Sequence, residues 1–259
     1  MTFDYEQKEF PSAVHQAIWN CIRNLFPLEK SLQNIAEEPL RSDCISYYRC
    51  FRETYEDMYE HPEQYHIPVE EIGFALNGTG FRKAIISAKW HNDKQREKTL
   101  QLIGRVRFLD MLRFRLCVQP SDAVTSEDDR LFMSEKEAKK MIQAIGRDLR
   151  LKINDLLALF QKRGFGFTFD NERCYLQNTD YPGVMRLMMR WREKCHSQKV
   201  AAGNPYLIAY AHADFRALLP DYQCSFEDAI TPMYQDQKRL LRMLDDALQE
   251  MKIRPKWSL

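Results

Sequence analysis

Residues 134–177 carry the strongest structural signals of the chain and read SEKEAKKMIQAIGRDLRLKINDLLALFQKRGFGFTFDNERCYLQ. Ser134 and Glu137 have the spacing of a capping box, in which side chains and backbone amides satisfy one another at the start of a helix. Apolar residues then recur at three- and four-residue steps, and Gly164 suits the left-handed position that ends a helix. The pattern predicts one continuous helix, because the apolar stripe passes Gly146 without a break in phase.

A hairpin is predicted directly after this helix, near residues 165–177. Three phenylalanines occupy every second position, as in a strand: Phe165, Phe167 and Phe169. Asp170 and Asn171 supply a turn, and residues 174–176 can form the returning strand. Two strands are marginally stable alone, so the hairpin must pack on helices or on strands that the sequence does not reveal.

Helical periodicity extends over most of the remaining chain. Further helices are predicted over residues 12–26, 28–36, 43–60, 81–90, 93–118, 182–195 and 206–218, with another that begins at residue 225 and a final one over about 231–252. The RVRF and RFRL pieces, residues 105–116, also alternate with period two, so a short strand is an alternative there. Thr231 as the cap and Pro232 at the first position predict where the last helix begins. The sequence therefore predicts a mainly α, multi-helix globular protein with one β-hairpin, α+β by a small margin.

The domain organisation is suggested by composition. The chain has 259 residues, of which 44% are hydrophobic and 29% are charged, as in ordinary globular proteins. Residues 121–133, SDAVTSEDDRLFM, are polar and acidic and form a candidate linker. The prediction is an N-terminal helical lobe at 1–120 and a C-terminal helical lobe with the hairpin at 134–259, with a single domain as the alternative.

Charge is distributed unevenly although the net charge is only +1. Residues 1–72 hold 6 basic and 14 acidic side chains, whereas residues 73–119 hold 10 basic and 3 acidic ones. We expect the acidic and basic segments to face each other. The alternative is that one of them, above all the basic segment 82–115, faces a partner.

The sequence indicates a cytoplasmic protein without a membrane partner. It contains no run of about 18 apolar residues, and its first residues lack the basic and apolar regions of a secretory signal. Its 7 cysteines include no C-x-x-C pair, which is typical of reduced thiols. Neither a metal-ligand pattern nor a nucleophile motif is present, so no catalytic residue, metal or cofactor is predicted.

The stretch FALNGTGFRKAIISAKW, residues 74–90, is interpreted as a turn that starts a helix. A Walker A loop requires Lys and Ser/Thr where Thr79 and Gly80 stand, and a dinucleotide loop requires glycine at Lys83. The alternative is an enzyme whose phosphate or anion site consists of the helix start with Thr79, Gly80, Arg82 and Lys83.

Nucleic-acid binding is a second interpretation of the opening segment. The order of helix and hairpin resembles the recognition helix and wing of a winged helix. If Gly146 broke the helix, Arg147, Arg150 and Lys152 would lie on a second helix and Arg173 on the wing, where basic side chains contact phosphates. Acidic residues interrupt this basic face, so a solvated face of mixed charge is the simpler reading.

Tyrosines offer a third kind of surface. Tyr47, Tyr59 and Tyr65 lie near acidic residues and could contact a partner, because tyrosine combines a large rigid area with a polar tip. With no catalytic motif visible, the leading hypothesis is a non-catalytic regulatory or scaffolding protein. It would bind another macromolecule, a protein before a nucleic acid, through charged and aromatic helical faces.

Overall fold

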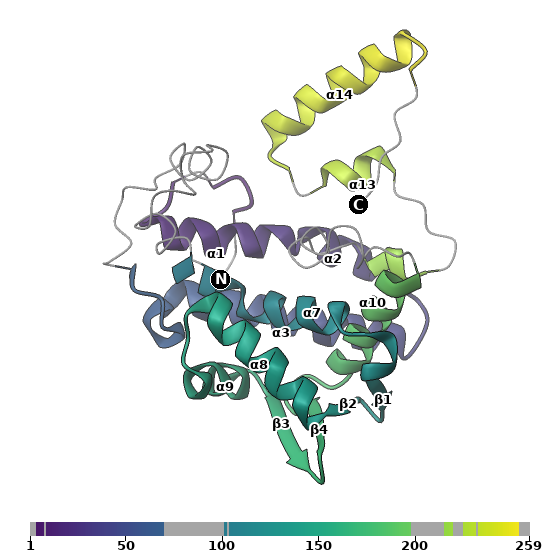
Figure 1. Cartoon of the computed structure of the whole chain (residues 1–259). Coiled ribbons are helices and arrows are strands. Elements are labelled where there is room, and N and C mark those ends of the chain that lie inside the picture. Colours follow the sequence, from purple (N-terminus) through teal and green to yellow (C-terminus); the bar gives the residue numbers. More distant parts are fainter. Residues whose placement is uncertain are drawn as a thin grey trace.

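The computed structural model describes residues 4–7, 9–69, 101–102, 104–197, 215–219, 225–231 and 233–253. It confirms a mainly helical globular fold (Figure 1). The helices are α1 (Ala13–Asn24), α2 (Phe26–Ser31), α3 (Leu40–Glu60), α7 (Phe108–Val118), α8 (Glu135–Leu149), α9 (Ile153–Lys162), α10 (Val184–Ser197), α13 (Phe226–Ile230) and α14 (Gln235–Glu250). Short 3-10 helices lie at Leu32–Asn34, Pro62–Tyr65, Arg105–Arg107, Ser121–Ala123 and Phe215–Leu218.

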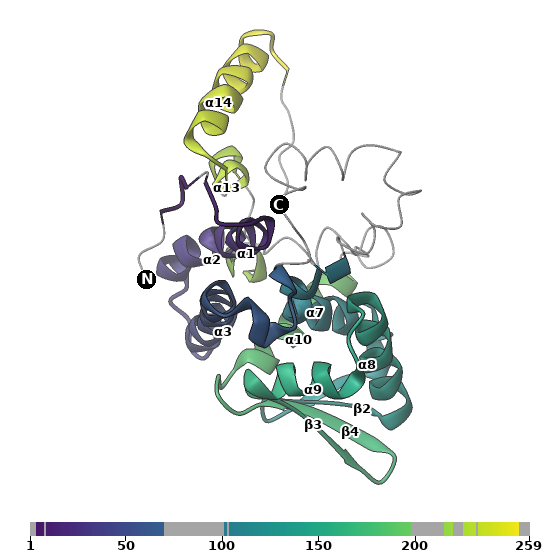
Figure 2. The same ribbon diagram turned by 90° about the vertical axis from the view of Figure 1, so that its left-hand side faces the viewer.

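The predicted hairpin belongs to a four-stranded antiparallel sheet. Its strands, in the order β1-β2-β4-β3, are β1 (Thr125–Glu127), β2 (Arg130–Ser134), β3 (Phe165–Asp170) and β4 (Arg173–Asn178). Alternate residues of the two inner strands, such as the paired Leu131 and Leu176, are buried. The sheet packs with this face against α8, α9 and α10, as Figures 1 and 2 show. The hairpin was expected to need helices or a further strand to pack on. It has both, since α8, α9 and α10 cover one face and β2 pairs with β4.

Residues 121–133 do not form a linker. They contain β1 and most of β2, and their acidic residues have structural roles. Asp128 and Asp129 both have positive φ and make the two-residue turn of the β1–β2 hairpin. The Asp129 carboxylate also accepts hydrogen bonds from the backbone N–H groups of Gly183 (2.5 Å) and Arg186 (2.9 Å) and so caps α10.

The buried core draws on both of the predicted lobes. Side chains of α1 and α3 pack in one cluster with side chains of α8, α9 and α10. Between these helices lies α7, where the strand alternative for residues 105–116 is wrong, since the segment forms a 3-10 turn followed by α-helix. The division into two lobes itself stays a prediction. The hydrophobic core is one cluster that contains side chains from both predicted lobes.

The long helix predicted from residue 134 is two helices. Ser134 caps α8 as expected, accepting a hydrogen bond from the N–H of Glu137 (3.2 Å). The helix then ends because Arg150 adopts a left-handed conformation (φ 50°) and the Leu151 N–H donates to the carbonyl of Gly146 (2.9 Å). A Cβ on Gly146 would lie only 3.1 Å from the Leu151 carbonyl oxygen, so the glycine permits the tight turn.

Candidate functional site

The C-terminal helix pair lies at the outer end of the molecule, with α13 between α14 and the first helices (Figures 1 and 2). Ser225 caps α13 in a reciprocal arrangement with Asp228, as its predicted helix start required. The predicted start of the last helix is wrong: Thr231 ends α13, its hydroxyl donating to the carbonyl of Glu227 (2.8 Å), and α14 begins after Tyr234. Pro232 lies outside the described residues.

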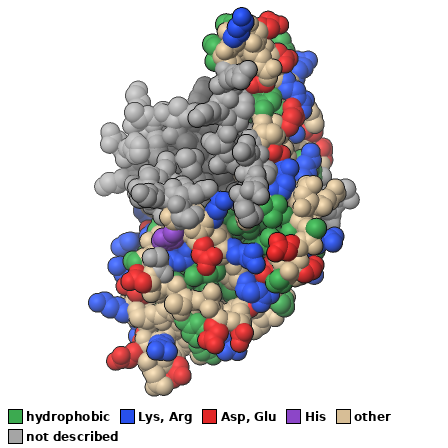
Figure 3. All heavy atoms as spheres, turned by 90° about the vertical axis from the view of Figure 1, so that its right-hand side faces the viewer, with side chains coloured by type: hydrophobic (Ala, Val, Ile, Leu, Met, Phe, Trp, Pro, Cys, Tyr) green, Lys and Arg blue, Asp and Glu red, His purple; other side chains and the backbone are tan. Residues whose placement is uncertain are grey.

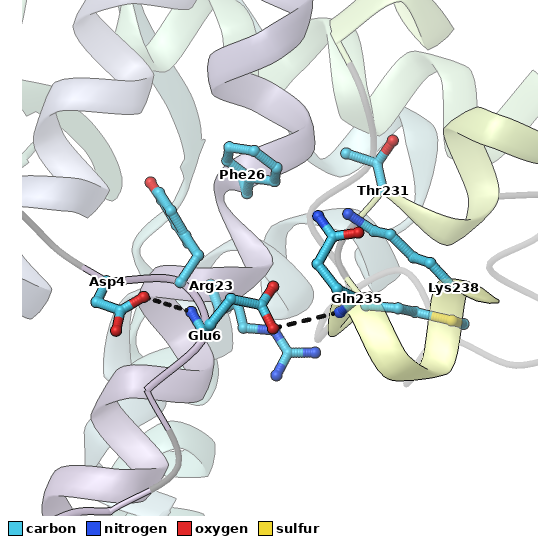
Figure 4. A pocket seen from close by; sticks show the side chains of 9 residues that line it. Asp4, Glu6, Arg23, Phe26, Thr231, Gln235 and Lys238 are labelled. Carbon is cyan, nitrogen blue, oxygen red and sulfur yellow. Dashed lines mark hydrogen bonds between the residues drawn. The ribbon is translucent and has the colours of Figure 1, made fainter. Parts of the chain in front are cut away.

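The start of α14 is fastened to the N-terminal part of the chain. The guanidinium of Arg23, from α1, lies 3.4 Å from the centroid of the Tyr234 ring, a close cation–π contact. The Glu6 carboxylate accepts a hydrogen bond from the first backbone N–H of α14, at Gln235 (3.3 Å; Figure 4). A carboxylate there is also favoured by the helix dipole. These contacts fix the start of α14 against α1 and the N-terminal segment.

A cavity of about 270 Å³ lies in this joint, between the N-terminal segment, α2 and α14 (Figure 4). Its lining includes Tyr5, Glu6, Arg23, Phe26, Gln235 and Lys238. Burial, together with the nearby cations Lys30 and Arg242, lowers the pKa of the Lys238 ammonium group. Side chains of both signs line the cavity, so its charge favours no single class of ligand, and its clearest role is to seat α14.

The outer face of α14 is apolar and exposed. Leu240 (61% exposed), Met243 (62%), Leu244 (50%) and Met251 (62%) follow one another at steps of three, one and seven residues and so share one side of the helix. The periodicity of this helix was predicted from the sequence, but a regular stripe normally faces a core. Large apolar side chains gathered on an exposed face mark an interaction site.

The charges of α14 are also unevenly placed. Its first half carries Arg239 and Arg242, and its second half carries Asp246 and Glu250. The Nε and Nη2 groups of Arg242 each donate a hydrogen bond to the carboxylate of Glu227 on α13 (2.9 and 2.7 Å). Arg239, Asp246 and Glu250 are exposed and form no ion pair with another described residue.

Two of the three tyrosines predicted as a partner surface are buried, so that prediction is wrong for them. The hydroxyl of Tyr47 accepts a hydrogen bond from Arg113 (3.0 Å) inside the core. The hydroxyl of Tyr65 donates to Asp57 (2.5 Å). Tyr59 is half-buried against the ring of His15, and their centroids are 5.0 Å apart.

The basic residues predicted to contact nucleic acid are exposed but do not form one surface. Arg147, Arg150 and Lys152 surround the turn between α8 and α9, rather than lying on a second helix. Arg173 begins β4, at the opposite end of α8, where the Glu135 N–H donates to the carbonyl of the neighbouring Glu172 (2.8 Å). On the face drawn in Figure 3, basic and acidic side chains of the described elements are interspersed.

The remaining predicted site, Thr79, Gly80, Arg82 and Lys83, lies outside the described residues. Among the residues that are described, no group of three His, Cys, Asp or Glu side chains is arranged to hold a metal ion. Helices long and apolar enough to cross a membrane are likewise absent from the described ranges. No family model, curated protein or solved structure matches this chain. Among the described residues, the exposed apolar face of α14 is therefore the feature that points most directly to a function.

Proposed function

We propose that this chain is a non-catalytic regulatory or scaffolding protein that binds another macromolecule through the outer face of α14. The observation that supports this most directly is the exposure of Leu240, Met243, Leu244 and Met251 on one side of a helix that is fastened at its base. The proposal keeps the helical-face binding expected from the sequence and moves it from the tyrosines of α3 and of the 3-10 helix that follows to α14.

Binding at this face would be driven by burial of apolar surface. Removing a leucine or methionine side chain from water stabilises a complex by about 1.5–3 kcal/mol before the costs of association are subtracted. An amphipathic helix is recognised through anchors spaced three, four and seven residues apart. Met243 and Leu244 lie three and four residues after Leu240, and Met251 lies seven after Leu244.

Site-specific photo-crosslinking tests the proposed surface. A benzophenone amino acid at position 243 should form adducts with another macromolecule in living source cells, and Leu244→Glu should abolish them. The same probe at position 249, about a third of a turn around α14 from position 243 and also exposed, is the matched control. Equal adduct yields at 243 and 249 would reject the outer apolar face of α14 as the binding surface.

A second candidate function, nucleic-acid binding, is favoured by one observation. The helix break that this interpretation required is present, and Arg147, Arg150 and Lys152 are all exposed around it. Titration with short duplex DNA and RNA should then show affinity that falls steeply with salt and is lost in Arg147→Glu/Arg150→Glu. Absence of binding at low salt, or equal loss in Lys140→Glu on exposed α8 surface, would reject it.

A further inference from the structure

We infer that the macromolecule covering the outer face of α14 is a second copy of this chain, whose own α14 packs antiparallel to the first. The inference rests on the proposed function, since it names the partner of the same face. A two-fold symmetric contact uses one patch twice, so a single exposed face on each copy is sufficient to build it.

The order of charges along α14 is the first argument. A helix dipole favours acidic side chains at the N-terminus and basic ones at the C-terminus. Beyond its first turn α14 has the reverse order: Arg239 and Arg242 precede Asp246 and Glu250, and its last turn holds no basic residue. Arg242 is paired with Glu227 in the same chain, but Arg239 and Glu250 are exposed and have no ion-pair partner among the described residues.

An antiparallel second copy supplies those partners. It sets the basic half of one helix beside the acidic half of the other, whereas a parallel copy would set like charges side by side. Arg239 and Glu250 are 11 residues apart, close to three full turns, so both lie on the same edge of the apolar face. A two-fold axis keeps equivalent edges on the same side of the pair, and therefore brings Arg239 of each helix to Glu250 of the other.

The apolar contact and the charge contact require the same register. Matching Leu240 of one helix with Met251 of the second copy covers the whole exposed face. In that register, Arg239 and Glu250 of the second copy differ in height by two residues, about 3 Å along the axis. Side chains of this length span such an offset, so a single arrangement satisfies both contacts.

The oligomeric state of the full chain tests the inference. Sedimentation over a concentration series should show the 30.8 kDa monomer giving way to a species of twice that mass. Leu244→Glu, which places a charge in the middle of the apolar face, should leave monomer only. Ile45→Glu, at an exposed apolar position of α3, is the matched control and should associate like the natural chain.

Charge reversal distinguishes the antiparallel pair from other modes of association. Arg239→Glu and Glu250→Arg should each weaken the dimer by about tenfold, since each creates two like-charge contacts in a symmetric pair. The double variant should restore it. Both replacements improve the match between α14 and its own dipole, so a weakened helix would not account for a loss. Lys140→Glu controls for the change in net charge that Arg239→Glu brings.

A monomer at every concentration, a dimer insensitive to Leu244→Glu, or a double reversal that fails to restore association would each overturn the inference. These results are separable from failure of the proposed function. If the probe at position 243 attaches to a different macromolecule while the chain stays monomeric, the binding face stands and only the second copy is rejected. If neither association nor an adduct is found, both proposals fail.

Discussion

Asp57 shows how single side chains join distant parts of this chain. Its carboxylate, near the end of α3, accepts a hydrogen bond from the Tyr65 hydroxyl (2.5 Å) and lies 3.1 Å from the Lys162 ammonium group. It also forms an ion pair with Arg163 just after α9. Three segments separated by up to 106 residues thus meet at one carboxylate, which ties the N-terminal helices to α9.

Replacing Asp57 with Asn should destabilise the fold by about 1–2 kcal/mol at pH 7. Burial alone would raise the pKa of Asp57, but hydrogen bonds from Tyr65 and Lys162 and the charge of Arg163 hold it below its usual value. Because the folded state has the lower pKa, this stabilisation is complete above the unfolded pKa of about 3.9 and is lost as the pH falls through the folded pKa. Urea unfolding from pH 7 to pH 2 measures it.

The comparison needs a carboxylate that lacks these partners. Asp155→Asn, on the first turn of α9, removes a half-buried carboxylate for which the described residues offer no ion pair. It should change stability at pH 7 far less than Asp57→Asn. A stability difference between Asp57→Asn and the natural chain that stays constant down to pH 2 would contradict the assignment.

The tyrosines explain why sequence periodicity places individual residues poorly. The sequence suggests a partner contact for Tyr47 because acidic residues lie near it in the chain. In the folded protein its hydroxyl accepts a hydrogen bond from Arg113, 66 positions further along the chain, and that of Tyr65 accepts one from Arg163, 98 positions further along. A local pattern contains no information about such distant partners.

At the scale of elements, the sequence predicted the regular segments better than their ends. The apolar stripe from residue 134 and the alternation near residue 165 correctly identified helix and hairpin. The break at Arg150 was not predicted, because the apolar stripe resumes in phase after the turn. The turn itself depends on the close approach of the Leu151 carbonyl oxygen to Gly146. Strand β2 was not predicted, because its short apolar run, Leu131 to Met133, follows a stretch of acidic residues that resembles a linker.

Asp128 and Asp129, in the turn between β1 and β2, allow the contribution of the α10 cap to stability to be tested. Asp129→Ala should cost about 1–2 kcal/mol, because it removes the carboxylate that caps α10 and also strains a position with φ of 60°. Asp128→Ala is the control: the position has φ of 45° but no cap is lost. Chemical unfolding of both should place Asp129→Ala about 1 kcal/mol below Asp128→Ala, and equal midpoints would show that only backbone strain matters.

α14 marks the limit of periodicity as a guide to function. The structure divides the apolar stripe that the sequence indicates: Leu241 and Leu248 are half-buried, whereas Leu240 and Leu244 are exposed. Whether an apolar side faces a core or a partner depends on what the rest of the fold places against it. No feature within residues 235–250 could have separated these two outcomes.

At the scale of the molecule, one core predicts one unfolding transition for the body of the protein. Trp19 lies in α1 and Trp191 in α10, one in each predicted lobe, and both are buried. In variants whose other tryptophans are replaced by phenylalanine, urea-induced changes in the fluorescence of either residue should coincide with loss of helical circular dichroism. Two separate midpoints, one for each tryptophan, would support the two-lobe division instead.

The place of β2 in the sheet has a consequence for how the protein is made. Leu131 pairs with Leu176, so β2 leaves the ribosome 45 residues before the strand that completes it. At synthesis rates of about 5–20 residues per second, that edge waits for roughly 2–9 s. An unpaired strand edge invites pairing with other chains. During translation this edge of β2 therefore stays open to other chains until β4 follows, because α8 packs on the face of the sheet and leaves the edge uncovered.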